Sequence, residues 1–338
     1  MLRIDRYWHS LNPVAIVLFP LAVVFGVVVT LRRWAYRLRL RRVSRFPVPV
    51  IVVGNITVGG TGKTPLVIWL ADYLARQGWR PGIVSRGYGG GAQHWPQQVR
   101  ADSDPAVVGD EAVMLAARTR RPMCVGPDRP SAVAALLAHT DTNIVISDDG
   151  LQHYALGRDI EIAVVDGERR LGNGLLMPAG PLRERAGRLR RVDLVVVNGQ
   201  GGEGEYSMKI HQPGVRSLHG DTRQTLEAFA GRSVHAVAGV GNPQRFFDLL
   251  RRHRVTVNEH VFADHHAFVE RDLALEPALP ILMTEKDAVK CRRLACRDCW
   301  VVQVDAQPDA AFVLRLNSIL KEISDGQEAS GHPRVPDL

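Results

Sequence analysis

The sequence predicts an α/β protein built on mostly parallel β-sheets, with an apolar helix near its N-terminus. Short β-rich runs alternate with longer helix-like stretches, which is typical of a parallel sheet covered on both faces. A glycine-rich loop separates the first such run from the first such helix, and an uncharged apolar segment precedes both. At 338 residues the chain is long enough for two α/β domains, each with its own core.

The N-terminal region contains an uncharged apolar run of eighteen residues, Val14–Leu31. This length is just sufficient to cross a bilayer. Seven arginines lie within Arg32–Arg45, whereas only Arg3 and Arg6 precede the run, so the positive-inside rule places the C-terminal part in the cytoplasm. A secretory cleavage pattern is absent, and we expect the run to remain as an anchor. A buried core helix and a helix lying along the membrane surface are the alternatives.

The net charge of +8 raises the question of a polyanionic partner. Much of the excess lies in the arginines beside the apolar run, where anionic lipids attract each basic residue by about 1 kcal/mol. We therefore expect anionic membrane lipid and no nucleic acid as a partner. A second basic cluster could be a solvated helix face, a lipid-facing patch or a phosphate-binding surface. It consists of Arg183, Arg185, Arg188, Arg190 and Arg191.

A phosphate-binding loop follows the apolar run Val50–Val53 and precedes the helix-like segment Pro65–Gln77. Its glycines let backbone N–H groups surround phosphate oxygens, its lysine can reach the β- and γ-phosphates, and its threonine hydroxyl can ligate Mg²⁺. Thr57 stands where the usual pattern has its first glycine, so the loop is a variant. The residues predicted to bind ATP are Thr57, Gly59, Gly60, Thr61, Gly62, Lys63 and Thr64.

Further strands are predicted along the chain, and ligands of parallel sheets collect just beyond the carboxyl ends of strands. The predicted strands are Gly82–Ser85, Ile144–Ser147, Ile162–Val165, Leu194–Val197, Val234–Val240 and Ile281–Thr284. Asp148 and Asp149 directly follow one of these strands. Two acids at this position can hold Mg²⁺ opposite a phosphate loop, although Asp-Asp-Gly is also a common turn. Because Lys63 and Thr64 are in the same chain, we favour a magnesium site made by Thr64, Asp148 and Asp149.

Two other polar segments are candidates for the site. Arg86 lies in a glycine-rich loop after the strand Gly82–Ser85, and this loop is either a linker or a second loop that approaches a ligand closely. Asp110 and Glu111 open a helix-like run, where acids also serve simply as helix caps.

The remaining candidates are an arginine and two histidines. Arg129 lies in a turn, where it is either a surface charge or a cation beside a transferring phosphate. His265 and His266 could ligate a metal, assist a base or be plain loop residues. Neighbouring side chains of an extended segment point in opposite directions, so we expect only one of them to face a given site.

Composition also sets the expected boundaries and the redox state. We expect an anchor and basic flank at residues 1–45, a phosphate-loop core at 46–225, a smaller α/β domain at 226–323 and a disordered tail at 324–338. Four cysteines without a secretory signal indicate reduced thiols in the cytosol. Three of them have the spacing C-x4-C-x2-C, but no fourth ligand lies nearby, so zinc is not expected.

Together these motifs resemble those of the tetraacyldisaccharide 4′-kinase family, the membrane-bound enzymes of lipid A assembly in Gram-negative bacteria. The family's phosphate loop also lacks the first glycine. The resemblance covers nearly all of the chain from the apolar run to about residue 305 and leaves out the cysteine cluster and the tail. It rests on Val53-Gly54-Asn55, Gly59-Gly60-Thr61-Gly62-Lys63-Thr64-Pro65, Ser85-Arg86-Gly87-Tyr88-Gly89-Gly90, Gly109-Asp110-Glu111, Asp148-Asp149-Gly150-Leu151-Gln152-His153, Asp166-Gly167, Pro178-Ala179-Gly180-Pro181-Leu182-Arg183-Glu184, Val197-Asn198-Gly199, Asp264-His265-His266 and Thr284-Glu285-Lys286-Asp287-Ala288.

The resemblance implies transfer of the γ-phosphoryl group of ATP, with Mg²⁺, to the 4′-hydroxyl of a tetraacyldisaccharide 1-phosphate, which yields lipid IVA. It implies a phosphate-loop NTPase-like fold of two α/β/α domains with an N-terminal membrane helix. The reaction would take place at the cytoplasmic face of the bacterial inner membrane, beside that membrane's anionic lipids.

Residue roles are also implied by the resemblance. Asp110 would be the base that takes the proton of the sugar hydroxyl, paired with a histidine for which we favour His265 over His266. Lys63 would bridge the β- and γ-phosphates, and Arg129 would contact a phosphate. The rival hypothesis is a membrane-tethered phosphate-loop ATPase or switch that acts on a protein partner and needs no such base. A soluble kinase of a small metabolite is disfavoured by the apolar run.

Overall fold

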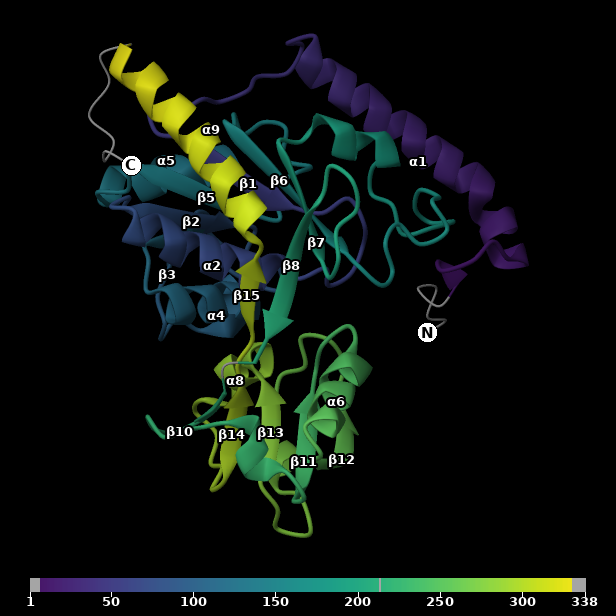
Figure 1. Ribbon diagram of the computed structural model, residues 1–338, viewed down its shortest axis with the longest axis vertical. Coiled ribbons are helices and arrows are strands. Elements are labelled where there is room, and N and C mark those ends of the chain that lie inside the picture. The colour runs from purple at the N-terminus through teal and green to yellow at the C-terminus, as the bar shows by residue number, and fades with distance from the viewer. Residues whose placement is uncertain (1–6, 213, 330–338) are drawn as a thin grey trace. The chain divides into compact units, whose positions relative to one another are not determined.

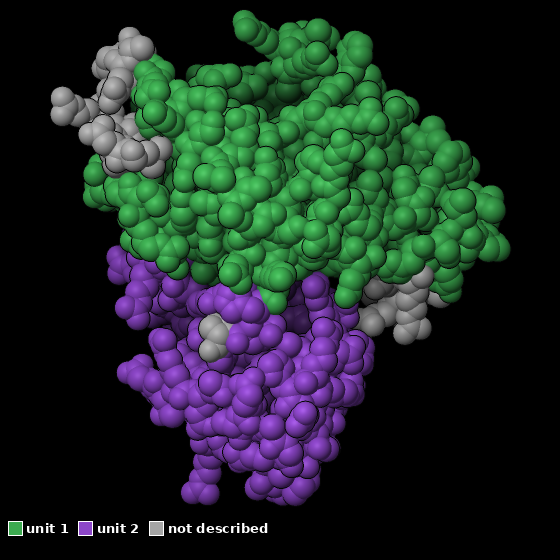
Figure 2. Space-filling model, in the orientation of Figure 1, with its two compact units in different colours: residues 1–86, 121–210, 306–338 green, residues 87–120, 211–305 purple. Residues whose placement is uncertain are grey.

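The computed structural model describes residues 7–212 and 214–329 and shows an α/β protein (Figure 1). The chain forms two compact units (Figure 2). Unit 1 comprises residues 1–86, 121–210 and 306–338, and unit 2 comprises residues 87–120 and 211–305. This division differs from the expected boundaries. Residues 87–120, expected in the phosphate-loop core, belong to unit 2, and the segment from residue 306 onward belongs to unit 1.

Unit 1 is built on a sheet with the strand order β15-β8-β7-β6-β1-β5-β2-β4. The central strands are parallel and almost entirely buried, as expected of strands covered on both faces. Each strand that the sequence predicted here is present. The bounds are β1 Val50–Gly54, β2 Pro81–Ser85, β4 Met123–Val125, β5 Ile144–Asp148, β6 Ile160–Asp166, β7 Leu194–Asn198, β8 Tyr206–His211 and β15 Asp305–Pro308.

Helices cover this sheet through regularly spaced apolar residues. In α2 (Lys63–Arg76), for example, Leu66, Leu70 and Leu74 recur every four residues and are fully buried. The other helices of unit 1 are α1 Pro13–Arg37, α5 Arg129–His139, the 3₁₀ helix η2 Ala186–Arg191 and α9 Ala310–Ala329.

The expected disordered tail is wrong for residues 324–329. These residues continue α9, which is held in place by the buried side chains of Phe312, Leu316 and Leu320 at intervals of four. Residues 330–338, which complete the expected tail, lie outside the described residues.

Helix α1 contains the apolar run. It starts with the Asn12 side chain accepting a hydrogen bond from the Ala15 N–H, followed by Pro13 in the first turn. Among the described residues it is the helix long and apolar enough to cross a membrane, and only 17 % of its most apolar window is buried. The alternative of a buried core helix is therefore wrong. The helix contacts unit 1 at Gly26, where an added Cβ would come within 2.7 Å of the Leu176 side chain.

Unit 2 contains a sheet with the strand order β10-β9-β14-β13-β11-β12, whose strands β12, β11, β13 and β14 are parallel. The strand bounds are β9 Val215–Ser217, β10 Arg223–Gln224, β11 Ser233–Ala238, β12 Thr256–Val261, β13 Ile281–Thr284 and β14 Cys299–Val302, with β3 at Gln97–Val99. The helices are α3 Pro105–Val108, α4 Asp110–Thr119, η3 Leu226–Phe229, α6 Pro243–Arg252, α7 Glu270–Leu273 and α8 Glu285–Cys291. Helix α4 packs against α8, which joins the two segments of unit 2.

The cysteines depart from the expectation of four reduced thiols. Cys296 and Cys299 form a disulfide, with Cα atoms 5.8 Å apart, a separation that suits this bond. Cys124 and Cys291 are free and buried. Within the described residues, no three histidine, cysteine or acidic side chains are arranged to hold a metal ion.

Candidate active site

The phosphate loop of unit 1 connects β1 to α2 and depends on two glycines with positive φ. Gly59 has φ +102°, and Gly62, with φ +94°, is the N-cap of α2. An added Cβ at Gly62 would lie 2.9 Å from the Asn198 Nδ2 atom. Since no side chain caps α2, its first N–H groups remain available for an anion at the positive end of the helix.

The variant position Thr57 has a structural explanation. Thr57 forms an antiparallel bridge with Leu182, and the neighbouring Val58 N–H donates to the Pro181 carbonyl at 2.8 Å. The backbone here is extended rather than left-handed, so a glycine is not required. Within the loop, the buried Thr61 hydroxyl has no hydrogen-bond partner among the described residues.

The two acids at the end of β5 lie beside the phosphate loop. Asp148 is paired in register with Val53 of β1, the strand that leads into the loop. The Asp149 carboxylate lies 3.5 Å from the Lys63 Nζ atom and 3.0 Å from the Arg183 Nη1 atom. Burial alone would raise the pKa of Asp149, but the two cations outweigh it and hold the pKa below its ordinary value. The structure thus brings Lys63 and Asp149 together, as the site prediction requires.

Arg129 is buried next to the backbone of Asp148 and does not lie on the surface. It is 1 % exposed, and it donates to the Gly126 carbonyl at 2.7 Å and to the Asp148 carbonyl at 3.3 Å. Burial lowers the pKa of Arg129 to about 10, although Asp148 and Asp149 oppose this. In this arrangement Arg129 holds the backbone at Asp148. Arg86, in contrast, is exposed at the end of β2.

Two residues that received no role from the sequence complete the loop's surroundings. Arg169 donates hydrogen bonds to the Gly60 carbonyl and to the Asp166 carboxylate, which lies at the end of β6. Asp166 could have been found by the signal that found the magnesium candidates, a polar residue at the carboxyl end of a buried parallel strand, and Arg169 follows it by three residues.

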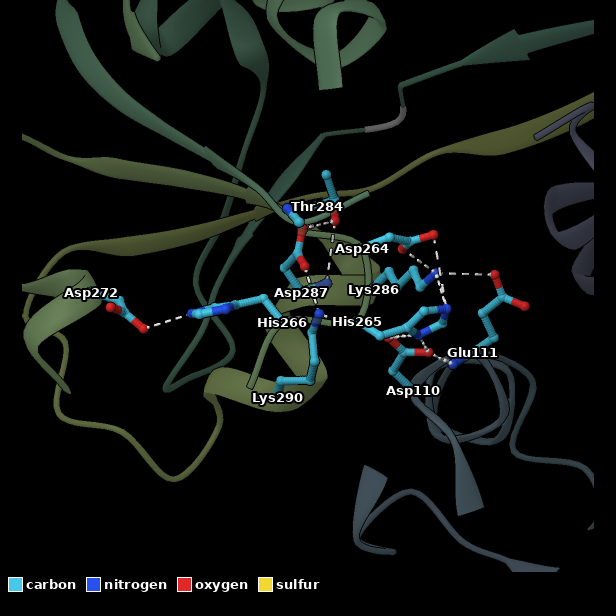
Figure 3. A network of polar contacts seen from close by, with 11 residues as sticks. Asp110, Glu111, Asp264, His265, His266, Asp272, Thr284, Lys286, Asp287 and Lys290 are labelled. Atoms are coloured by element: carbon cyan, nitrogen blue, oxygen red, sulfur yellow. Dashed lines mark hydrogen bonds and ion pairs between the residues drawn. The ribbon is translucent and has the colours of Figure 1, made fainter. Parts of the chain in front are cut away.

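In unit 2, the buried Asp110 carboxylate binds His265 (Figure 3). The His265 Nδ1 atom lies 3.0 and 3.1 Å from the two carboxylate oxygens. Asp110 is the first residue of α4, follows Gly109 with φ +93°, and also accepts a hydrogen bond from the Glu111 N–H at 2.8 Å. His265 has φ +61° and packs on the Tyr88 ring with centroids 5.1 Å apart.

His266 points away from this pair. Its Nε2 atom lies 2.9 Å from the Asp272 carboxylate, and its ring packs against Phe262 and Phe268. Neighbouring histidines thus serve different partners, and His265 is the one that meets Asp110. The segment is a turn with His265 at φ +61°, so the extended backbone on which the expectation relied is not present.

Two lysines of α8 surround the Asp110–His265 pair (Figure 3). The Lys286 Nζ atom lies 2.9 Å from Asp264, 3.4 Å from Glu111 and 3.5 Å from the His265 Nε2 atom. Burial acts to lower the pKa of Lys286, but the acids around it outweigh burial and raise the pKa above its ordinary value.

Lys290 is the more deeply buried of the two lysines. Its Nζ atom lies 2.8 Å from Asp287, 3.7 Å from Asp110 and 5.1 Å from the centre of the Phe268 ring. The sequence analysis assigned a role to neither lysine. Their separation of four residues, which places both on one face of a helix, is the signal that could have found them.

The geometry of the pair defines how it can handle a proton. Because both Asp110 oxygens are near Nδ1, the Nδ1–H donates to the carboxylate and Nε2 is left as the acceptor of the ring. A carboxylate that orients a histidine in this way is an arrangement used for general-base catalysis.

The fold and the phosphate loop define an α/β enzyme that handles the phosphates of a nucleotide. Residues 14–321 match the family described as tetraacyldisaccharide-1-P 4′-kinase. Proteins named tetraacyldisaccharide 4′-kinase are similar over most of their length. The one from Nitrosococcus oceani is 53 % identical over 94 % of each chain, and the one from Azoarcus sp. is 50 % identical over 95 % of each.

A solved structure of LpxK from Aquifex aeolicus in complex with ATP is 25 % identical, with a TM-score of 0.77 over 91 % of this chain and 99 % of that one. The chain therefore belongs to the tetraacyldisaccharide 4′-kinase family. The predicted family, fold class and kinase activity on the 4′-hydroxyl of the lipid A precursor are confirmed, and the ATP-bound neighbour supports ATP as the phosphate donor.

Proposed function

We propose that this kinase acts at the cytoplasmic face of the inner membrane, that unit 1 holds ATP with Mg²⁺, and that unit 2 supplies the base. The observation that carries the assignment of the base is the contact of 3.0 Å between buried Asp110 and His265. A sugar hydroxyl is a poor nucleophile until a base takes its proton.

The residues of unit 1 suit a nucleotide bound with Mg²⁺. The free N–H groups at the start of α2 would bind phosphate oxygens, and Lys63 would bridge the β- and γ-phosphates. The hydroxyl of Thr64 and the carboxylates of Asp148 and Asp149 are the hard oxygen donors that Mg²⁺ prefers. The ion would neutralise charge on the phosphate oxygens. Arg129 would act by holding the Asp148 backbone in place.

In the transfer step, the 4′-oxygen forms a bond to the γ-phosphorus while the bond from that phosphorus to the β,γ-bridging oxygen breaks. The proton of the hydroxyl passes to the Asp110–His265 pair, and ADP leaves with the electron pair of the broken bond. Lys286 and Lys290 hold the pair in place through Asp264, Glu111 and Asp287 and act as positioning residues.

Membrane attachment is supported by the surface of α1. Its apolar side chains are largely exposed, and basic residues follow at its C-terminal end. Exposing an apolar surface along the whole length of a helix raises the free energy in water, whereas the same surface is stable in the hydrocarbon interior of a bilayer. Deleting residues 1–31 should release the protein from membranes washed with alkaline carbonate; retention would contradict an anchoring role.

The test of the catalytic assignment uses purified full-length protein, ATP labelled at the γ-position, Mg²⁺ and a tetraacyldisaccharide 1-phosphate. Label should move to the lipid. Asp110→Asn should lower the rate by about 10²–10⁴-fold, Lys63→Ala and Asp149→Ala should abolish transfer, and the exposed Asp102→Asn should leave it unchanged. Near-normal transfer by Asp110→Asn would refute the base assignment, and labelled free phosphate without labelled lipid would refute transfer to lipid.

A further inference from the structure

A surface cavity of about 700 Å³ lies in unit 1, and no residue of the phosphate loop lines it. Its walls are formed by the C-terminal end of α1, the segment around Arg158, and η2 with the residues that follow it. The guanidinium groups that line it are those of Arg33, Arg37, Arg158, Arg188 and Arg191. Five guanidinium groups and three carboxylates give the lining a net charge of +2.

The three carboxylates of the cavity are already engaged by the protein. Asp159 accepts a hydrogen bond from the Val50 N–H at 2.8 Å, and Asp193 accepts one from the Glu161 N–H at 2.8 Å. Glu161 in turn binds Arg158 at 2.9 Å and also binds Arg188. Two of the five arginines therefore share one carboxylate of the wall, and Arg188 has a second acidic partner in Glu184 at 3.7 Å.

Arg33, Arg37 and Arg191 form no ion pair within the part of the chain that the structure describes. Like charges around one cavity repel each other unless an anion lies between them. Guanidinium groups bind phosphate oxygens in pairs of parallel hydrogen bonds, which makes a phosphate group the matching ligand.

The aromatic part of the wall is held in place. The rings of Tyr36 and Tyr154 lie 5.9 Å apart, and the Arg158 guanidinium stacks over the Tyr154 ring at 5.6 Å. The Tyr154 hydroxyl donates to the buried Glu184 carboxylate. These contacts fix the wall before any ligand arrives, so less ordering is needed on binding.

The position of the cavity on α1 identifies the source of the phosphate. Arg33 and Arg37 lie within a few residues of the exposed side chains of Leu31 and Trp34 at the end of the apolar helix. Tryptophan and arginine at this position of a membrane helix lie at the level of the lipid headgroups. A ligand here can place its phosphate in the cavity and its acyl chains along α1.

We propose that this cavity binds the phosphate of an anionic glycerophospholipid of the bilayer, as a lipid site distinct from the kinase centre. None of the residues assigned above to ATP, Mg²⁺ or the base lines it. The proposal rests on the proposed membrane attachment through α1.

The test measures lipid retained by the full-length protein in detergent micelles, by native mass spectrometry, during titration with phosphatidylglycerol or phosphatidylcholine. The pocket variant is Arg33→Gln/Arg37→Gln/Arg191→Gln. The control variant, Arg39→Gln/Arg42→Gln/Arg190→Gln, removes the same charge from exposed arginines outside the cavity. The parent should prefer phosphatidylglycerol, and the pocket variant should lose at least about tenfold of that affinity because direct hydrogen bonds to charge are lost.

The outcomes separate this proposal from its rivals. Equal losses in the two variants would show only general surface attraction and overturn the site. Displacement of phosphatidylglycerol by millimolar glycerol phosphate, or an unchanged phosphatidylglycerol affinity with a raised KM for the disaccharide substrate, would assign the cavity to a soluble phosphate or to the substrate and overturn it too. Failure of the membrane attachment is read separately, from the carbonate wash of the deletion variant, and does not depend on the arginines.

Discussion

Replacing Lys290 with methionine tests how much the positive charge of this lysine stabilises unit 2. The Lys290 side chain is 9 % exposed and lies between two acids that are themselves buried, Asp287 at 0 % and Asp110 at 3 %. Lys290→Met keeps the length of the side chain and its contact with Phe268 but removes the charge. It leaves the two carboxylates without their shared cation.

The size of the effect follows from what each carboxylate retains. Removing one partner of a buried ion pair costs about 3–5 kcal/mol. Asp287 keeps hydrogen bonds from the Gly239 N–H at 2.9 Å and the Thr284 hydroxyl at 2.7 Å, so we expect the lower end, about 3 kcal/mol. For a unit of this size, that loss lowers the unfolding midpoint by roughly 10 °C.

The assay is thermal unfolding of full-length protein in detergent, followed by circular dichroism. Lys321→Met, which removes an exposed lysine, is the matched control and should change the midpoint by less than about 2 °C. The double variant Asp287→Asn/Lys290→Met removes both charges and should be more stable than Lys290→Met alone. A single variant within 1 kcal/mol of the parent, or a double variant with merely additive losses, would refute the reasoning.

Three further predictions concern other parts of the chain. Burial, with help from nearby arginines, lowers the pKa of His153 to about 4. Neutral His153 therefore contributes up to about 3 kcal/mol to the free energy of unfolding, which is fully present above pH 6.5 and is lost as the pH falls toward 4. His153→Gln should flatten this part of the pH–stability curve measured by thermal unfolding. Burial raises the pKa of Cys124 to about 11 and that of Cys291 to about 12; mass spectrometry should find iodoacetamide on both thiols only after denaturation, and rapid labelling of native protein would contradict this. Gly109→Ala places a Cβ 2.5 Å from a backbone carbonyl oxygen at φ +93° and should lower both the midpoint and kinase activity, whereas Gly187→Ala, with open space, should change neither.

The central strands of unit 1 were predictable because they are local signals. In a continuous apolar run such as Val50–Val53 or Ile144–Ser147, the side chains on both faces of the strand must be buried, which requires a covering layer on each side of the sheet. This pattern can be recognised in the sequence alone. Strand β12, Thr256–Val261, escaped prediction because it is an edge strand with four exposed residues and little apolar character.

The candidate site was predictable to the extent that it lies at strand ends. Asp148 and Asp149 were found because they directly follow a buried parallel strand, and the phosphate loop because its glycines and lysine have a fixed spacing. The contact of Asp110 with His265 spans 155 positions, and only the family resemblance connected them. For Arg129 the local signal was misleading. A turn in the sequence indicates an exposed side chain, yet this side chain is buried against backbone carbonyls.

The division of the chain has a direct consequence for the proposed base, Asp110. Unit 2 is made from two separate stretches, and Asp110 comes from the first while His265, Lys286 and Lys290 come from the second. A boundary at residue 225, as composition suggested, would detach α4 from α8 and β9 from β14. Asp110 would then lose its contacts with His265 and Lys290, and the proposed base would lose its partners. The Asp110–His265 pair therefore depends on the packing of α4 against the second stretch of unit 2, which includes α8. If Asp110 is the base, as proposed, any change that loosens this packing should lower catalysis.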